Sequence, residues 1–340
     1  MGMRKGRILV TGGCGYIGSH TIVDLIDNGY EVVAVDNLSN ADESALAGVA
    51  KITGRQVRNH VIDLAEREPT LRLFREEQLT GVIHFAALKA VGESVQQPLR
   101  YFYNNINSLL NVMAGMAETG VNNLIFSSSC SVYGNTTDLP VTETTPRQAA
   151  ESPYARTKQM GEDILQDYCR VHPAFKTVLL RYFNPAGAHP SSLIGEASAN
   201  PASNLVPVIT ETAMGKRSEM TVFGDTYATR DGSCIRDYIH VMDLAHAHTL
   251  ALDFLLANRQ QSNCELFNLG IGEGVSVLEA IRAFEQVTGQ RLNYRIGPAR
   301  PGDVEAIYAN YDKAAAELGW QPTYDITDIM RSAWAWQQVR

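Results

Sequence analysis

Apolar residues in the first half of the chain fall into short runs separated by segments of helical periodicity. The runs are "RILVTGG", "YEVVAVDN", "GVIHFAAL", "NNLIFSSSC" and "KTVLLRYFN", beginning at residues 7, 30, 81, 122 and 176. Between the first two runs, Ile17, Ile22, Leu25 and Ile26 recur at helical spacing, and residues 99–119 and 154–172 form longer helical segments. Alternation of strand-length apolar runs with helices predicts an α/β fold with a doubly wound parallel sheet, covered by helices on both faces.

The pattern changes near Asn184, where "NPAGAHPSSLIGEASANPASN" is rich in Pro, Ser, Ala and Gly. Such a composition indicates irregular structure and a change of domain. Beyond it, the short runs "MTVFG", "CELFNLG" and "RLNYRIG" alternate with further helices. We therefore predict two domains, residues 1–181 and a smaller α/β domain over 182–340, with part of 236–272 returning to the first.

Composition narrows the class of protein. The 340 residues are 45% hydrophobic and 19% charged, with a net charge of −8 and no basic run, which argues against a nucleic-acid partner. No apolar run approaches the ~18 residues of a membrane span, and the start "MGMRKGRILV" enters a strand without a signal-peptide pattern. The five scattered cysteines contain no C-x-x-C pair, so we expect free thiols, no metal site and a cytoplasmic location.

The segment "VTGGCGYIG" joins the first apolar run to the first helix. Its glycines can be read as Gly12-x-x-Gly15-x-x-Gly18 or with Gly13 first, a pattern that lets the backbone approach a pyrophosphate at a helix N-terminus. Asp36 ends the second run, where its carboxylate can accept a hydrogen bond from the adenosine ribose and repel a 2′-phosphate. These features favour NAD as cofactor; the alternative is an ordinary strand-end turn.

The segment "SPYARTKQMGED" places Tyr154 one helical turn before Lys158, on the same helix face. A phenol titrates near ~10, so a base at neutral pH needs a drop of about three units, which one cation about 4 Å away can supply. Ser129 ends the strand "NLIFSSS" and can hydrogen-bond a reacting hydroxyl. Beside an NAD loop, these three residues predict alcohol oxidation, whereas alone Tyr154 and Lys158 could be a solvated pair.

The chain resembles the extended short-chain dehydrogenase/reductase family over its whole length, and within it the nucleotide-sugar 4-epimerases. The resemblance is carried by TGGCGYIG, by Ser129, Tyr154 and Lys158, and by "FAALKAVGES", "RYFNPAGAHP", "IRDYIHVMDLA" and "RPGD". It implies a Rossmann-type domain that retains NAD through turnover and interconverts UDP-galactose and UDP-glucose through a transient 4-keto sugar. Tyr154 would take the 4-OH proton, Ser129 would bind the reacting oxygen, and Lys158 would bind the nicotinamide ribose and tune Tyr154.

The same resemblance implies two sets of contacts and a homodimer built on residues 99–119 and 154–172. The cofactor set is Gly12, Gly15, Tyr16, Ile17, Gly18, Asp36, Asn37, Leu38, Asn40, Asp63, Leu64, Phe85, Ala86, Lys89, Asn104, Tyr154, Lys158 and Phe183. The set for the UDP-sugar substrate is Ser129, Tyr154, Asn184, Asn204, Leu205, Thr221, Phe223, Arg236, Arg300 and Asp303.

Three other functions are known for this fold: a dehydratase, a decarboxylase and a non-catalytic NAD sensor. Dehydratase relatives carry an Asp-Glu pair where this chain has Cys130 and Ser131, which disfavours water elimination. A decarboxylase acting on UDP-glucuronate stays possible, while a non-catalytic NAD sensor would not need Tyr154 and Lys158. Ile307 falls where relatives carry tyrosine or a small residue near the sugar, so we expect N-acetylated UDP-sugars to be poor substrates.

Overall fold

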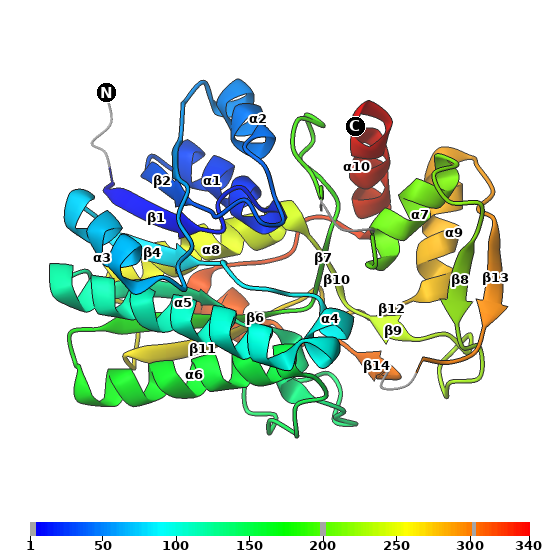
Figure 1. Ribbon diagram of the computed structural model, residues 1–340. Helices are drawn as coiled ribbons and strands as arrows, with labels where there is room; N and C mark the ends of the chain where they lie inside the picture. The colour runs from blue at the N-terminus through cyan, green and yellow to red at the C-terminus, as the bar shows by residue number, and fades with distance from the viewer. Residues whose placement is uncertain (1–4, 198–201, 301–303) are drawn as a thin grey trace.

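A seven-stranded parallel sheet forms the larger part of the protein (Figure 1). The computed structural model describes residues 5–197, 202–300 and 304–340. The strand order is β11-β6-β5-β4-β1-β2-β3. The bounds are β1 Arg7–Thr11, β2 Glu31–Val35, β3 Arg58–His60, β4 Gly81–His84, β5 Asn123–Ser127, β6 Lys176–Tyr182 and β11 Cys264–Leu269.

Helices cover both faces of this sheet, as the apolar runs predicted. One face packs against α1 (Tyr16–Asp27), α2 (Ser44–Thr53) and α8 (Val241–Leu256), and the other against α3 (Arg67–Glu76), α5 (Pro98–Thr119) and α6 (Pro153–Val171). In β1, Ile8 and Val10 belong to the first core and Leu9 to the second, and all three are fully buried. Because side chains alternate along a strand, a sheet buried on both faces needs the continuous apolar runs seen in the sequence.

A smaller unit stands at one end of the sheet, on the right of Figure 1. It contains α7 (Leu205–Ala213), α9 (Val277–Thr288), α10 (Ile326–Val339) and the parallel pair β8 (Met220–Phe223) and β13 (Tyr294–Gly297), around a core of Ile209, Phe284 and Met330. The chain does not stay in this unit after it enters it. Residues 241–256 (α8) pack on α1, and β11 pairs with β6 at the edge of the large sheet.

Short strands and turns connect the two units. β7 (Asn184–Ala186) pairs with β10 (Tyr238–His240), and β9 (Ile235–Arg236) lies between β12 (Val275–Ser276) and β14 (Ala306–Ile307). The remaining elements are α4 (Val91–Gln96), the 3₁₀ helix η1 (Cys130–Tyr133) and the π-helical turn η2 (Ala314–Leu318). Within the described ranges, no helix combines the length and the apolar character that crossing a membrane requires.

Local sequence signals determine where the functional helix α6 begins. Ser152 caps it, with its Oγ accepting a hydrogen bond from the Ala155 amide at 3.2 Å, and Pro153 occupies the first helical position. Proline is favoured there because its missing N–H would have no partner within the helix. The helix therefore starts one residue before Tyr154, which places Tyr154 in its first turn.

Candidate active site

The residues singled out in the sequence gather at the carboxyl edge of the large sheet. Parallel strands bring their carboxyl ends to one edge, and ligands of open α/β sheets bind there. The residues that follow β1, β2, β4 and β5 at this edge are Gly12, Asp36, Phe85 and Ser129, separated by up to 117 positions in the chain. Asp63 follows β3 and Phe183 follows β6.

The turn between β1 and α1 has the geometry of a phosphate-binding loop. Gly12 adopts φ +68°, and a Cβ on Gly18 would lie 2.2 Å from the Gly12 carbonyl oxygen, so both positions require glycine. α1 begins at Tyr16 after Gly15, and no side chain caps its first amides. Those N–H groups are therefore available to an anionic ligand at the helix N-terminus.

Asp36 lies at the rim of this loop and fits an adenosine ribose. Its carboxylate accepts hydrogen bonds from the amides of Cys14, at 3.2 Å, and Leu38, at 2.9 Å. Burial raises the pKa of Asp36, and these two hydrogen bonds oppose that shift. Leu38 itself has φ +59°, which directs the chain away from β2. The loop and the acidic residue at the end of β2 together fit NAD.

The loop after β4 is held by a residue that sequence reasoning missed. Oγ1 of Thr11, the last residue of β1, accepts hydrogen bonds from the amides of Phe85 and Ala86, both at 3.1 Å. Thr11 therefore connects the ends of two adjacent strands beside the cofactor turn. Its signal in the sequence is a polar side chain at the end of an apolar strand, directly before Gly12.

The other predicted cofactor residues surround the same edge. Asp63 and Leu64 lie between β3 and α3, and the Leu64 carbonyl accepts a hydrogen bond from the Asn111 side chain at 2.9 Å. Asn104 lies on α5, where its side chain donates to Asn105 at 3.0 Å. Lys89 follows β4 and forms an ion pair with Glu196, with 3.5 Å between Nζ and Oε1. Ile17 follows Tyr16 in α1, and Asn37 and Asn40 lie in the loop after β2.

The structure brings Ser129, Tyr154 and Lys158 together at this edge of the sheet. The Ser129 hydroxyl acts to lower the pKa of the Tyr154 phenol, and Nζ of Lys158 lies 5.9 Å from the centre of the Tyr154 ring. Lys158 donates to the Ser127 carbonyl at 2.5 Å and is 5% exposed. The end of β5 therefore determines the positions of both Ser129 and the Lys158 side chain, although Lys158 belongs to α6.

The pKa values of these groups differ from the expectation drawn from sequence. Burial raises the pKa of Tyr154 to about 12, against a lowering contribution from the Ser129 hydrogen bond. Burial also lowers the pKa of Lys158 to about 8, because an ammonium group loses its hydration there. The expected fall of the phenol pKa is thus absent when only the protein's own groups act, because burial of the phenol outweighs the lowering contribution of Ser129.

A second phenol lies near that of Tyr154. The Tyr182 hydroxyl at the end of β6 hydrogen-bonds Oγ of Ser127, and proximity to Tyr154 contributes to raising the Tyr182 pKa. The sequence did not indicate a role for Tyr182; its only distinguishing feature was a hydroxyl group at the end of an apolar strand. Tyr182 is thus a neighbour of Tyr154, but its hydroxyl contacts Ser127 and not Ser129.

A buried ion pair supports α6 one turn after Lys158. Glu162 is fully buried and pairs with Arg181 of β6 through two contacts of 2.8 and 2.6 Å. Ser128 donates to the same carboxylate at 2.5 Å. Because Ser128 precedes Ser129, this network connects α6 to the strand end that carries Ser129.

The predicted substrate residues lie on the smaller unit and the connecting strands. Asn184 lies in β7 and Arg236 in β9, while Thr221 and Phe223 lie in β8. Asn204 occupies the N-cap position of α7, directly before Leu205. The Arg300 guanidinium lies 4.5 Å from the centre of the Phe223 ring. Asp303 lies outside the described residues. Oδ1 of Asn184 is buried and has no hydrogen-bond partner in the described part of the chain, which suits a residue that awaits a polar ligand.

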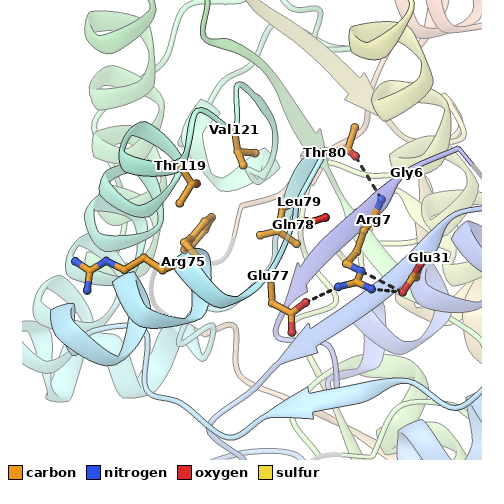
Figure 2. A pocket seen from close by; sticks show the side chains of 11 residues that line it. Gly6, Arg7, Glu31, Arg75, Glu77, Gln78, Leu79, Thr80, Thr119 and Val121 are labelled. Carbon is orange, nitrogen blue, oxygen red and sulfur yellow. Dashed lines mark hydrogen bonds and ion pairs between the residues drawn. The ribbon is translucent and has the colours of Figure 1, made fainter.

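A large surface hollow lies at the other end of the sheet and is not part of this site. It has a volume of about 860 Å³ and is lined by residues at the start of β1 and the ends of α3 and α5. Figure 2 shows Arg7 bridging Glu31, at 2.5 Å, and Glu77, at 2.8 Å, across it. Its charged groups thus pair with one another at the amino ends of the strands, away from the residues described above.

Comparison with known proteins agrees with this arrangement. Residues 9–333 match the family model described as GDP-mannose 4,6 dehydratase. A UDP-glucose 4-epimerase of Dictyostelium discoideum is 46% identical over 98% of this chain and 96% of its own length. A crystal structure of UDP-glucose-4-epimerase from Stenotrophomonas maltophila, with bound NAD and formylated UDP-arabinopyranose, is 46% identical and covers 98% of both chains with a TM-score of 0.94. The enzyme from Bifidobacterium longum, in complex with NAD+ and UDP, is 43% identical with the same coverage and TM-score.

Proposed function

The chain belongs to the UDP-glucose 4-epimerase family, and we propose that it interconverts UDP-galactose and UDP-glucose with NAD as a retained cofactor. The observation that carries this proposal is the buried grouping of Ser129, Tyr154 and Lys158 at the same carboxyl edge of the sheet as a turn that fits NAD. Inversion at C4 through a ketone needs one group that both removes and returns the hydroxyl proton, and Tyr154 is placed for both steps.

The roles of the chain's own residues follow from their contacts. Tyr154 exchanges the proton of the 4-OH, and Ser129, whose hydroxyl acts on the Tyr154 pKa, orients the reacting oxygen. Lys158 provides positive charge beneath the phenol from a position fixed by the Ser127 carbonyl. NAD, when bound, supplies the acceptor for the C4 hydride and returns it. On the substrate side, Arg236 and Arg300 bear forked donors that suit a diphosphate, with Asn184 near the sugar.

The direct test uses proton NMR of the purified protein with UDP-galactose and no added cofactor. A mixture of UDP-galactose and UDP-glucose supports both the reaction and the retained NAD. Loss of water from the sugar would instead indicate a dehydratase, the activity after which the matching family model is described. A lack of conversion of UDP-galactose, even after NAD is supplied, would contradict the proposal.

Ile307 sets the size of the sugar that the site accepts. It is 6% exposed and lies in β14 opposite Arg236 of β9, packed with Val132 and Phe183. We expect UDP-N-acetylglucosamine to be epimerised far more slowly than UDP-glucose, because the branched side chain occupies space that an acetamido group needs. Ile307→Ala should raise the kcat/KM for UDP-N-acetylglucosamine, relative to that for UDP-glucose, about tenfold. This is the range for a few methyl groups in an apolar pocket.

The matched control for Ile307 is Val275, the neighbour of Arg236 on the opposite side of β9. Val275 packs with the core of the smaller unit, so Val275→Ala should leave the substrate ratio unchanged. Comparable turnover of the two substrates by the unaltered protein would contradict the expectation at once. A ratio that Ile307→Ala does not change would show that another residue limits the pocket.

The active form proposed here is a homodimer that uses α5 and α6, and its cellular location is proposed to be the cytoplasm. Three large apolar side chains lie exposed on α5, namely Leu99 (82%), Tyr103 (65%) and Leu110 (43%), and their spacings of four and seven place them on one face. Such a stripe favours burial against a partner of the same kind. The five cysteines are all free thiols, which fits a reducing compartment.

Leu99→Glu combined with Tyr103→Glu should convert the dimer to a monomer, because burying two carboxylates at an apolar interface is unfavourable. Analytical ultracentrifugation should give twice the chain mass of 37.3 kDa for the unaltered protein and the single chain mass for the variant. Val61→Glu, at a 60% exposed apolar residue away from α5 and α6, is the control and should remain a dimer. A monomeric unaltered protein would contradict the proposal.

A further inference from the structure

Glu196 contacts both Lys89, a predicted cofactor residue, and Asn204, a predicted substrate residue. It follows a hairpin closed by an antiparallel bridge between Ala188 and Gly195. Its backbone carbonyl accepts hydrogen bonds from Trp336, at 3.1 Å, and Arg340, at 3.4 Å, which anchor it to the C-terminal helix region. With its backbone held there, the position of its side chain is restricted, and that side chain is only 14% exposed.

The Glu196 carboxylate reaches across from the smaller unit to the large sheet. Oε1 accepts a hydrogen bond from the Asn204 side chain at 2.9 Å and lies 3.5 Å from Nζ of Lys89. Lys89 follows β4 and belongs to the predicted cofactor set, whereas Asn204 caps α7 and belongs to the predicted substrate set. A single oxygen atom thus joins the two sides of the site.

The phosphate-loop helix lies near the same carboxylate. The charge of Glu196 contributes to raising the pKa of Tyr16, the first residue of α1. The Tyr16 hydroxyl donates to the Gly187 carbonyl at 2.6 Å, a direct contact between α1 and the segment that leads to Glu196. This hydrogen bond and the Lys89–Glu196 ion pair hold the segment 187–196 against elements that surround the cofactor turn.

We propose that Glu196 is a positioning residue that closes the site over the cofactor by holding Lys89 and Asn204 in fixed positions. This inference rests on the proposed function, since a 4-keto sugar can return to an alcohol only if the same cofactor stays bound. The ion pair to Lys89 acts on cofactor retention, and the hydrogen bond to Asn204 acts on UDP binding. The two effects are separable because they involve different properties of the carboxylate, its charge and its acceptor oxygen.

Two substitutions at Glu196 separate these effects. Glu196→Gln removes the charge but keeps an oxygen that can accept from Asn204, so NAD should bind about fivefold more weakly while UDP affinity is unchanged. Glu196→Ala removes both, so the Kd values of NAD and UDP should both rise. Lys89→Met should weaken NAD binding at least as much as Glu196→Gln, and the double variant should bind NAD no more weakly than Lys89→Met alone.

The measurement is the Kd of NAD, and separately of UDP, by titration calorimetry of protein from which bound nucleotide has been removed. Glu118→Gln, which alters an exposed carboxylate paired with Arg75, controls for net charge. Equal NAD affinity of Glu196→Gln and the unaltered protein, or additive effects with Lys89→Met, would overturn the inference. An unaltered protein that binds NAD but does not epimerise would instead contradict the proposed function, and the Kd comparison would still decide on Glu196.

Discussion

Tyr154→Phe should lower kcat for UDP-galactose by about 10³-fold or more, the upper range for loss of a general acid–base group. Phenylalanine keeps the ring that lies near Lys158 and removes only the hydroxyl. The variant should still fold and bind NAD, because the cofactor turn between β1 and α1 is unchanged. Initial rates from a coupled assay for UDP-glucose, with bound nucleotide measured after denaturation, check both parts of this expectation.

Tyr182→Phe is the matched control for this experiment. Tyr182 is a second buried phenol near Tyr154, but its hydroxyl hydrogen-bonds Ser127 instead of Ser129. Its removal should leave kcat within about tenfold of the original value, since one neutral hydrogen bond is worth about 1 kcal/mol. If Tyr182→Phe were as inactive as Tyr154→Phe, or if Tyr154→Phe stayed active, Tyr154 would not be the group that exchanges the proton.

The pKa values explain why the reaction depends on the complete site. In the protein alone, burial keeps the Tyr154 phenol protonated at neutral pH, with a pKa of about 12, and brings the Lys158 pKa down to about 8. Both shifts have the same origin, the cost of removing a charge from water. Tyr154 is therefore a proton donor until further positive charge enters the site.

Glu162→Gln should lower the free energy of unfolding by about 3–5 kcal/mol, the usual cost of leaving one member of a buried ion pair alone. Arg181 would remain charged while only 3% exposed, and one acceptor for Ser128 would be altered. Urea denaturation at a fixed, saturating NAD concentration measures this change without a contribution from different cofactor occupancy.

The adjacent Asp163 provides a control on the same helix. Asp163 pairs with Arg147 at 2.5 Å, but its side chain is 47% exposed, so Asp163→Asn should cost less than about 1 kcal/mol. The double variant Glu162→Leu, Arg181→Met should be more stable than Glu162→Gln, because no unpaired charge remains in the interior. Equal stabilities of Glu162→Gln and Asp163→Asn would show that the buried pair does not support the helix.

Local patterns in the sequence were sufficient for the type and order of most elements of the large sheet. Strands β1, β2, β4, β5 and β6 begin within one residue of the expected apolar runs, and α5 and α6 lie within one residue of their expected bounds, whereas the short strand β3 was not among the expected runs. Gly12 and Gly18 were recognisable because their backbone conformation and close contacts admit little else. Tyr154, Lys158 and Ser129 stay predicted as the catalytic group, because alcohol oxidation requires those residue types beside such a turn.

The sequence by itself thus determined the parallel α/β architecture and NAD as the cofactor, since each depends on periodicity or spacing within a short segment, and it predicted the residues of the candidate catalytic group. Only the tertiary structure decided which distant residues became partners. It placed Glu196 between Lys89 and Asn204, paired Glu162 with Arg181, and directed Nζ of Lys158 to Ser127. Such contacts depend on strand order and on how two units pack, and burial then sets their charges and pKa values.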